Sequence, residues 1–107
     1  MKSIFSVTTS DGSTLIHIAA RSNAKKVITL LVDKNLVNPQ QLNNDQNSAL
    51  HVACELGFEE SALYLCSVGC NPAQGNVHAN TPIHLACKSR NSRLVKSILQ
   101  SLSLIHI

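Results

Sequence analysis

The chain has 107 residues and a formal net charge of +3, and 44% of its residues are hydrophobic although only 3% are aromatic. That length suits one domain with a core of aliphatic side chains and alanine. It lacks both an apolar run of the roughly 20 residues that cross a bilayer and a signal-peptide core at its start, so we expect an intracellular protein, cytoplasmic or nuclear, with no membrane contact.

One seven-residue phrase occurs three times, as residues 14–20, 48–54 and 81–87, with spacings of 34 and 33 residues. Each copy opens on Thr or Ser, which caps a helix by accepting a hydrogen bond from a free backbone N–H. Pro82 follows in the third copy, at the first helical position, where its missing N–H costs nothing. A His lies three residues after each cap and can reach back to it. The phrase therefore predicts three helix starts with a structural His.

A period of 33 or 34 residues carrying T-P-L-H-x-A resembles the ankyrin-repeat family, and the resemblance covers nearly all of the chain. It implies an all-α solenoid of stacked helix-turn-helix units with projecting β-hairpin or loop fingers. In the family the His joins helix to turn, so the resemblance implies a structural role for the caps, the proline and the histidines. These are Thr14, His17, Ser48, His51, Thr81, Pro82 and His84.

Taken in order, residues 4–9 suggest the returning arm of a finger whose first arm is absent. Repeat one then spans about 11–43, repeat two 44–75, and an incomplete repeat three 76–101, all within one domain of residues 1–107. Residues 102–107 fit no repeat position and resemble a translation of a transposon end used to prepare sequencing libraries. A non-native tail and a natural helix end both remain open for them.

Two glycine positions of the family are filled by other residues here. Gln46 and Ala79 replace the glycine of the turn before the cap, and Asn23 and Arg90 replace the glycine between the helices. Ala and Arg adopt positive φ poorly. We therefore expect the positions of Ala79 and Arg90 to be looser or differently shaped.

Charge alternates between the repeats. Repeat one carries +2, repeat two −4 and repeat three +4. Equivalent positions predict two ladders of alternating sign, each exposed pair contributing about 0 to 1 kcal/mol: Arg21, Glu55 and Lys88, and Lys26, Glu60 and Arg93. The alternative is a nucleic-acid surface made by Lys88, Arg90, Arg93 and Lys96, which the acidic middle repeat disfavours.

The histidines and four cysteines raise the question of a metal or catalytic site. Stacked repeats separate one His from the next by about 10 Å, too far to share a metal ion. The cysteines form no C-x-x-C pair, and all four occupy positions where small apolar residues pack. No nucleophile, base and orienting acid recur, and no phosphate-binding glycine motif is present. We expect no enzyme activity, no metal and no cofactor.

In the ankyrin family, finger tips and the concave face of the first helices bind protein partners. The matching positions here are Ser10, Asp11, Ser13, Arg21, Ser22, Asn44, Asp45, Asn47, Glu55, Leu56, Val77, His78, Asn80, Lys88 and Ser89. The first hypothesis is therefore a monomeric, non-enzymatic protein-interaction module. The alternatives are a structural spacer and an accessory segment of a larger, catalytic protein.

Overall fold

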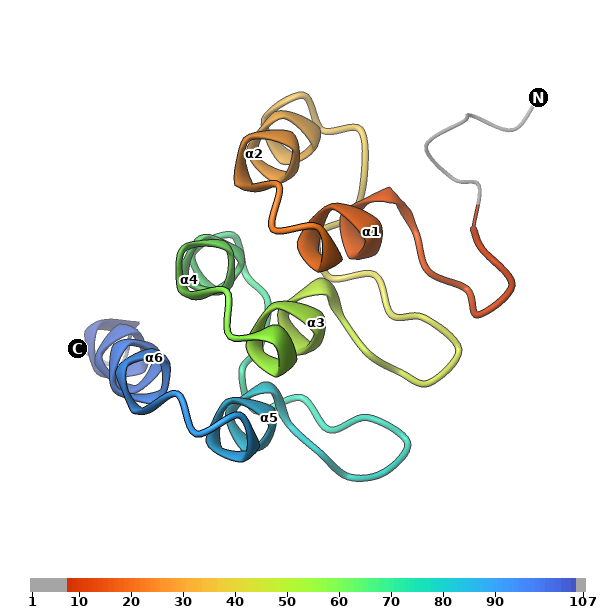
Figure 1. Cartoon of the computed structure of the whole chain (residues 1–107). Helices are drawn as coiled ribbons and strands as arrows, with labels where there is room; N and C mark the ends of the chain where they lie inside the picture. The colour runs from red at the N-terminus through yellow and green to blue at the C-terminus, as the bar shows by residue number, and fades with distance from the viewer. Residues whose placement is uncertain (1–7, 106–107) are drawn as a thin grey trace.

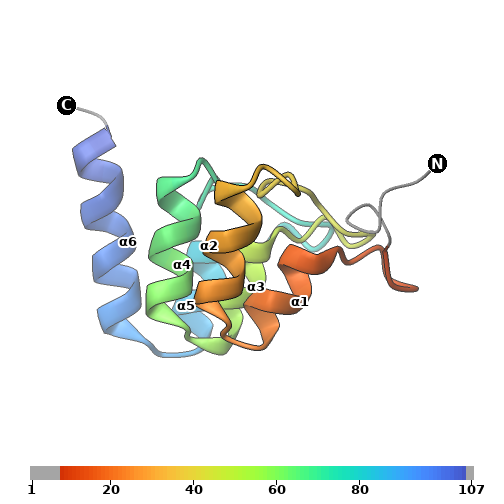
Figure 2. The ribbon, with the colours of Figure 1, turned by 90° about the horizontal axis from the view of Figure 1, so that it is seen from above.

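The computed structural model describes residues 8–105, with side chains as far as Gln100, and this part of the chain contains six helices and no strand. The helices are α1 (Leu15–Arg21), α2 (Lys25–Asp33), α3 (Ala49–Leu56), α4 (Glu59–Ser67), α5 (Pro82–Lys88) and α6 (Ser92–Ile105). They form three stacked pairs. One row contains α1, α3 and α5, and the other contains α2, α4 and α6 (Figures 1 and 2). The predicted all-helical solenoid is confirmed.

Each first helix begins after a residue with extended backbone. The Oγ of Ser48 accepts from the backbone N–H of His51 at 3.3 Å, and the Oγ1 of Thr81 accepts from that of His84 at 3.1 Å. Each second helix is preceded by a residue whose backbone N–H donates to the carbonyl of an alanine in the first helix. The carbonyls of Ala19, Ala53 and Ala86 accept from the residues that precede α2, α4 and α6. These three alanines are buried, so the two helices of each pair can approach closely.

A single apolar core runs through the stack between the two rows of helices. Ile16 and Ile28 supply it from the first pair, Leu50 and Leu65 from the second, and Leu94 and Ile98 from the third, all at 0% exposure. Because each pair buries its apolar side only against its neighbours, no pair has a complete core of its own.

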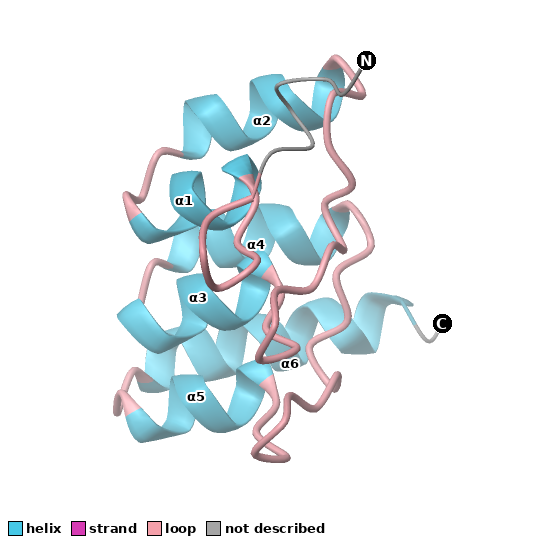
Figure 3. Cartoon of the chain, turned by 90° about the vertical axis from the view of Figure 1, so that its right-hand side faces the viewer, coloured by secondary structure: helices cyan, strands magenta, loops and turns pink. Residues whose placement is uncertain are grey.

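The fingers are loops closed by tight turns, and they project in one direction ahead of the first helices (Figure 1). Figure 3 views the chain from the side of the fingers, where these loops lie in front of the first helices. The backbone of the finger turns and of the turns between helices corrects the expectation that the positions without glycine are differently shaped. Ala79 has φ 61° and Arg90 has φ 58°, close to the 79° of Gly12 and the 78° of Gly57. The repeat geometry therefore imposes the left-handed conformation on residues that adopt it at a cost. Of the finger arm expected at residues 4–9, residues 4–7 lie outside the described residues, and the backbone N–H of Thr9 donates to the carbonyl of Ser13 at 2.9 Å.

The cysteines do not all pack as expected. Cys54, Cys66 and Cys70 are buried, whereas Cys87 is exposed although it ends the same phrase as Cys54. Repeat three covers Cys54, and no described element covers Cys87. Helix α6 continues to Ile105, beyond the position at which α2 and α4 end. No described helix is long and apolar enough to cross a membrane.

Candidate functional site

Two of the three histidines in the repeated phrase connect their own repeat to the finger of the next. The Nδ1 of His17 accepts from the backbone N–H of Thr14 at 3.1 Å, and its Nε2 lies 2.8 Å from the carbonyl oxygen of Asn47. The Nδ1 of His51 accepts from Ser48 at 3.0 Å, and its Nε2 lies 3.2 Å from the carbonyl oxygen of Asn80. Each ring therefore holds the backbone that leads from a finger into the following helix.

The partners of these rings determine their protonation. A backbone N–H can only donate and a backbone carbonyl can only accept, so the proton is on Nε2 and Nδ1 is free to accept. Desolvation by burial lowers the pKa of both His17 and His51 from the ordinary 6.5, against the raising effect of the carbonyl bonds. Neutral imidazole is the form that these contacts require.

A polar groove of about 450 Å³ lies between the second and third fingers and the helices α3 and α5 behind them. Exposed charged or polar side chains border it, and partly buried ones form its floor. The lining residues are Asp45, Asn47, Glu55, Asn76, His78, Asn80, Leu85, Lys88 and Ser89. We call this surface the concave groove.

Seven of the positions that the family resemblance implied for partner binding line the concave groove, namely Asp45, Asn47, Glu55, His78, Asn80, Lys88 and Ser89. The remaining ones do not. Five of them lie at the first finger and the end of α1, namely Ser10, Asp11, Ser13, Arg21 and Ser22. Ser13 is only 1% exposed, so its side chain is not available to a partner in this conformation.

Three further positions lie beside the groove. The backbone N–H of Asn44 donates to the carbonyl of Asp11 at 2.9 Å, and that of Val77 donates to the carbonyl of Asp45 at 3.0 Å. These bonds connect successive fingers. Leu56 and Val77 leave 47% and 51% of their surface exposed. They are the two apolar positions of the implied set.

Asn76 and Leu85 line the groove but were not anticipated. The Oδ1 of Asn76 accepts from the backbone N–H groups of His78 and Asn80, and its Nδ2 donates to the Oδ1 of Asn47 at 2.7 Å. Asn43 holds the preceding finger in the same way, through the N–H groups of Asp45 and Asn47. An Asn recurring 33 residues apart at the start of a finger was the signal available in the sequence.

The charges of the concave groove are not paired with each other. Among the described residues the one ion pair joins the Nε of Arg93 to the Oε2 of Glu59 at 3.1 Å, on the second helices. The predicted ladders are thus corrected. Arg93 meets Glu59 and not Glu60. Glu55 and Lys88 face the groove without an ion pair.

Two findings within the described part of the chain bear on metal binding and on the three buried cysteines. No group of three His, Cys, Asp or Glu side chains within the described part of the chain could hold a metal ion. Burial raises the pKa of the Cys54 and Cys70 thiols to about 12 and that of Cys66 to about 11. Protonated thiols are poor ligands and poor nucleophiles, so these three side chains act as apolar packing groups.

Comparison with known proteins finds similarity to ankyrin repeats and to NF-kappa-B-related proteins. A family model described as "Ankyrin repeats (3 copies)" matches residues 2–76. Human NF-kappa-B inhibitor alpha is 32% identical over 105 residues, covering 92% of this chain and 32% of the relative. The Drosophila melanogaster nuclear factor NF-kappa-B p110 subunit is 38% identical over 74 residues, 69% of this chain and 8% of the relative.

A Dictyostelium discoideum protein named NAD-dependent deacetylase sir2B is 27% identical over 104 residues, 88% of this chain and 13% of the relative. The chain thus spans about a third or less of the length of these curated relatives.

Proposed function

Because the chain belongs to the ankyrin-repeat family, we propose that it is a non-enzymatic protein-interaction module that binds its partner in the concave groove. The family and its NF-kappa-B-related relatives support the general role in protein binding. The position of the binding surface rests on the geometry of this chain. From the relatives we infer only the kind of partner, which is another intracellular protein. We do not infer its identity.

The observation that carries the proposal is the set of unpaired charges in the groove. Asp45 and Glu55 contribute acid, Lys88 contributes base, and Leu85 offers apolar surface between them. Exposed charges that do not neutralise each other are available to a partner, where complementary charge sets specificity and association rate. A polar segment bearing both signs around a small apolar side chain would fit this surface.

The distribution of basic residues argues for a protein partner over nucleic acid. Lys88 borders the concave groove, Arg93 is bound to Glu59, and Arg90 and Lys96 lie at the far end of the stack. They do not make one continuous basic surface, which phosphate binding would require. We propose a monomer that binds neither nucleic acid nor membrane.

The test is capture from cell extract on the immobilised chain, with bound proteins identified by mass spectrometry. Glu55→Lys and Lys88→Glu reverse charges in the groove, while Lys25→Glu and Glu60→Lys reverse exposed charges on second helices. We expect one set of proteins to be retained by wild type and both controls, lost by both groove variants, and weakened by salt. Equal retention by the groove variants would remove the groove from the proposal.

A second candidate is an accessory binding segment of a larger catalytic protein. It is favoured by the resemblance to the relative named as a deacetylase, of which this chain covers 13%. Recovery of the complete reading frame tests it: a catalytic domain in the same polypeptide supports this role, and its absence contradicts it.

A further inference from the structure

Two serines lie in one basic segment around the turn between α5 and α6. The segment is Lys88-Ser89-Arg90-Asn91-Ser92-Arg93, in a repeat that carries +4 and contains no acidic residue. Protein kinases select their substrates partly by the pattern of charges around the hydroxyl that they phosphorylate. By charge alone, both serines are candidate substrates of a kinase whose substrate-binding surface is acidic.

The structure distinguishes the two serines. The Oγ of Ser89 donates to the backbone carbonyl of Ala86 at 2.8 Å, at the carboxyl end of α5. A phosphate on Ser89 would replace that bond and lie beside the negative end of the helix, where added negative charge is disruptive. Ser92 is exposed and is the first residue of α6, at the positive end of a helix. The surroundings therefore favour a phosphate on Ser92 over one on Ser89.

The middle repeat shows that the fold accepts a negative charge at the position of Ser92. Glu59 is the first residue of α4, as Ser92 is the first residue of α6. The Oε2 of Glu59 lies 3.1 Å from the Nε of Arg93, and its Oε1 accepts from the Oγ of Ser97 at 3.0 Å. An anion at the first position of a second helix is thus already present in this stack and is bound by neighbouring side chains.

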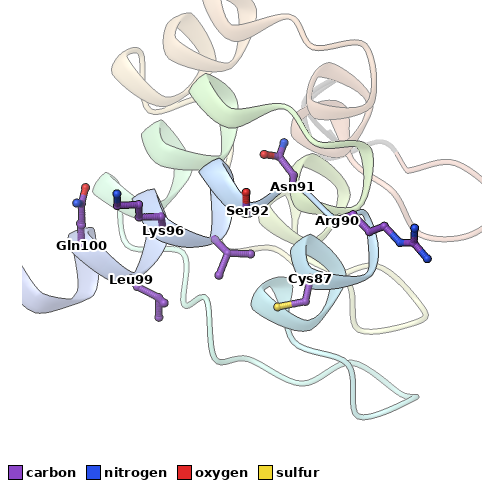
Figure 4. A pocket seen from close by; sticks show the side chains of 8 residues that line it. Cys87, Arg90, Asn91, Ser92, Lys96, Leu99 and Gln100 are labelled. Atoms are coloured by element: carbon purple, nitrogen blue, oxygen red, sulfur yellow. The ribbon is translucent and has the colours of Figure 1, made fainter.

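Two basic side chains near Ser92 are placed for different roles. Arg90, Ser92 and Lys96 line one groove of about 620 Å³ beside α6. In Figure 4 Ser92 lies between Lys96 and Arg90, and the guanidinium of Arg90 extends away from Ser92. Lys96 follows Ser92 by four residues on α6, the spacing at which an acid pairs with a base on its C-terminal side. Lys96 is therefore placed to bind a phosphate on Ser92, and Arg90 to contact a kinase.

We propose that Ser92 is a phosphorylation site for a serine kinase that recognises basic residues. The kinase transfers the γ-phosphoryl group of ATP to the Oγ of Ser92, ADP leaves with the electron pair of the broken P–O bond, and the hydroxyl proton passes to the catalytic base of the kinase. The phosphate adds a charge of about −2 to the third repeat and pairs with Lys96. Ser92 lies outside the concave groove, so the site does not depend on the proposed function.

The first test locates the phosphate. The folded chain and a synthetic peptide of residues 86–95 are each incubated with MgATP and the catalytic subunit of cAMP-dependent protein kinase, a kinase selective for basic substrates, and are mapped by mass spectrometry. In the folded chain we expect about tenfold more phosphate at Ser92 than at Ser89. Equal phosphate at the two serines, phosphate at Ser92 in the peptide alone, or none in either sample would each overturn the proposal.

Two variants separate recognition by the kinase from binding of the phosphate. Arg90→Asn removes the charge but suits the turn, because Asn23 has φ 54° in the equivalent turn of repeat one. It should lower the initial rate of phosphorylation at Ser92 about tenfold, whereas Lys96→Gln should leave that rate within about twofold. An unchanged rate in Arg90→Asn would contradict recognition through basic charge.

The melting temperature reports what the phosphate does once it is attached. Phosphorylation should raise the melting temperature of the parent by about 4 °C and that of Lys96→Gln by less. Ser92→Ala, treated with the kinase in the same way, is the control for phosphate elsewhere and should not change. A fall in the parent, or an equal rise in Lys96→Gln, would overturn the pairing of the phosphate with Lys96.

Discussion

The middle helix pair, α3 and α4, and the last pair, α5 and α6, begin with nearly the same phrase but have different surroundings. The middle pair packs against neighbours on both sides, so His51 and Cys54 are both buried. The last pair packs on one side only within the described residues, and His84 and Cys87 are exposed. Place in the stack, and not local sequence, decides whether a side chain contributes to stability, as expected when each repeat contacts only its neighbours.

The largest expected effect comes from a substitution that disrupts the packing of the middle pair. Leu50→Ala removes a fully buried side chain between two neighbours and should lower the free energy of unfolding by about 3 kcal/mol. The equivalent Ile83→Ala, in a partly buried position, should cost about 1 kcal/mol. Urea denaturation followed by circular dichroism measures both. Equal losses would mean that the two pairs are equally packed.

The histidines give the next comparison. His51→Ala leaves the backbone N–H of Ser48 and the carbonyl of Asn80 without this partner in a buried setting, and should cost about 2 kcal/mol. His84→Ala removes only the contact with its own cap, which is exposed, and should cost less than about 1 kcal/mol. The difference between their urea midpoints is the measurement. A larger loss for His84 would contradict the difference in burial.

Protonation of His17 and His51 at low pH should weaken the interfaces between repeats. The pKa values of His17 and His51 are lowered on folding, so below about pH 6.5 the unfolded chain binds more protons than the folded one. Stability is therefore fully present above that pH and is lost as the pH falls toward the lowered values. Urea midpoints between about pH 7.5 and about pH 5 should decline, and the decline should be shallower in His51→Ala.

The smallest expected effect concerns the turn between the two helices of a pair. The middle pair has Gly57 in this turn and the last pair has Arg90, and both residues have a positive φ. Arg90→Gly relieves a positive φ that Arg adopts at a cost and should stabilise the chain by about 0.5 to 1 kcal/mol. Gly57→Ala imposes that cost on the middle pair and should destabilise it by about 1 kcal/mol. Opposite signs of the two midpoint shifts are expected. A loss on Arg90→Gly would mean that its side chain contributes more than the strain costs.

Much of the fold could be predicted from local residues. The capping residues at 14, 48 and 81 fall where three helices begin, and the repeat period identified the family that the comparison with known proteins confirms. The prediction of a different backbone shape at Ala79 and Arg90 was wrong, because local preference for φ is weaker than the constraint that neighbouring repeats impose. The role of Asn76 in holding the third finger was missed although Asn43 precedes it by one repeat period, because Asn is favoured in polar loops whether or not it holds a finger.

The sequence by itself determined the number of helix pairs, their caps and the net charge of each repeat, because periodicity, capping chemistry and formal charge are local properties. The tertiary structure alone decided that Cys54 is buried while Cys87 is exposed, that Arg93 meets Glu59, and that Glu55 and Lys88 face a groove without an ion pair. These outcomes depend on which side chains of stacked helices meet and on which pair has a neighbour. Neither can be determined from the sequence of a single repeat.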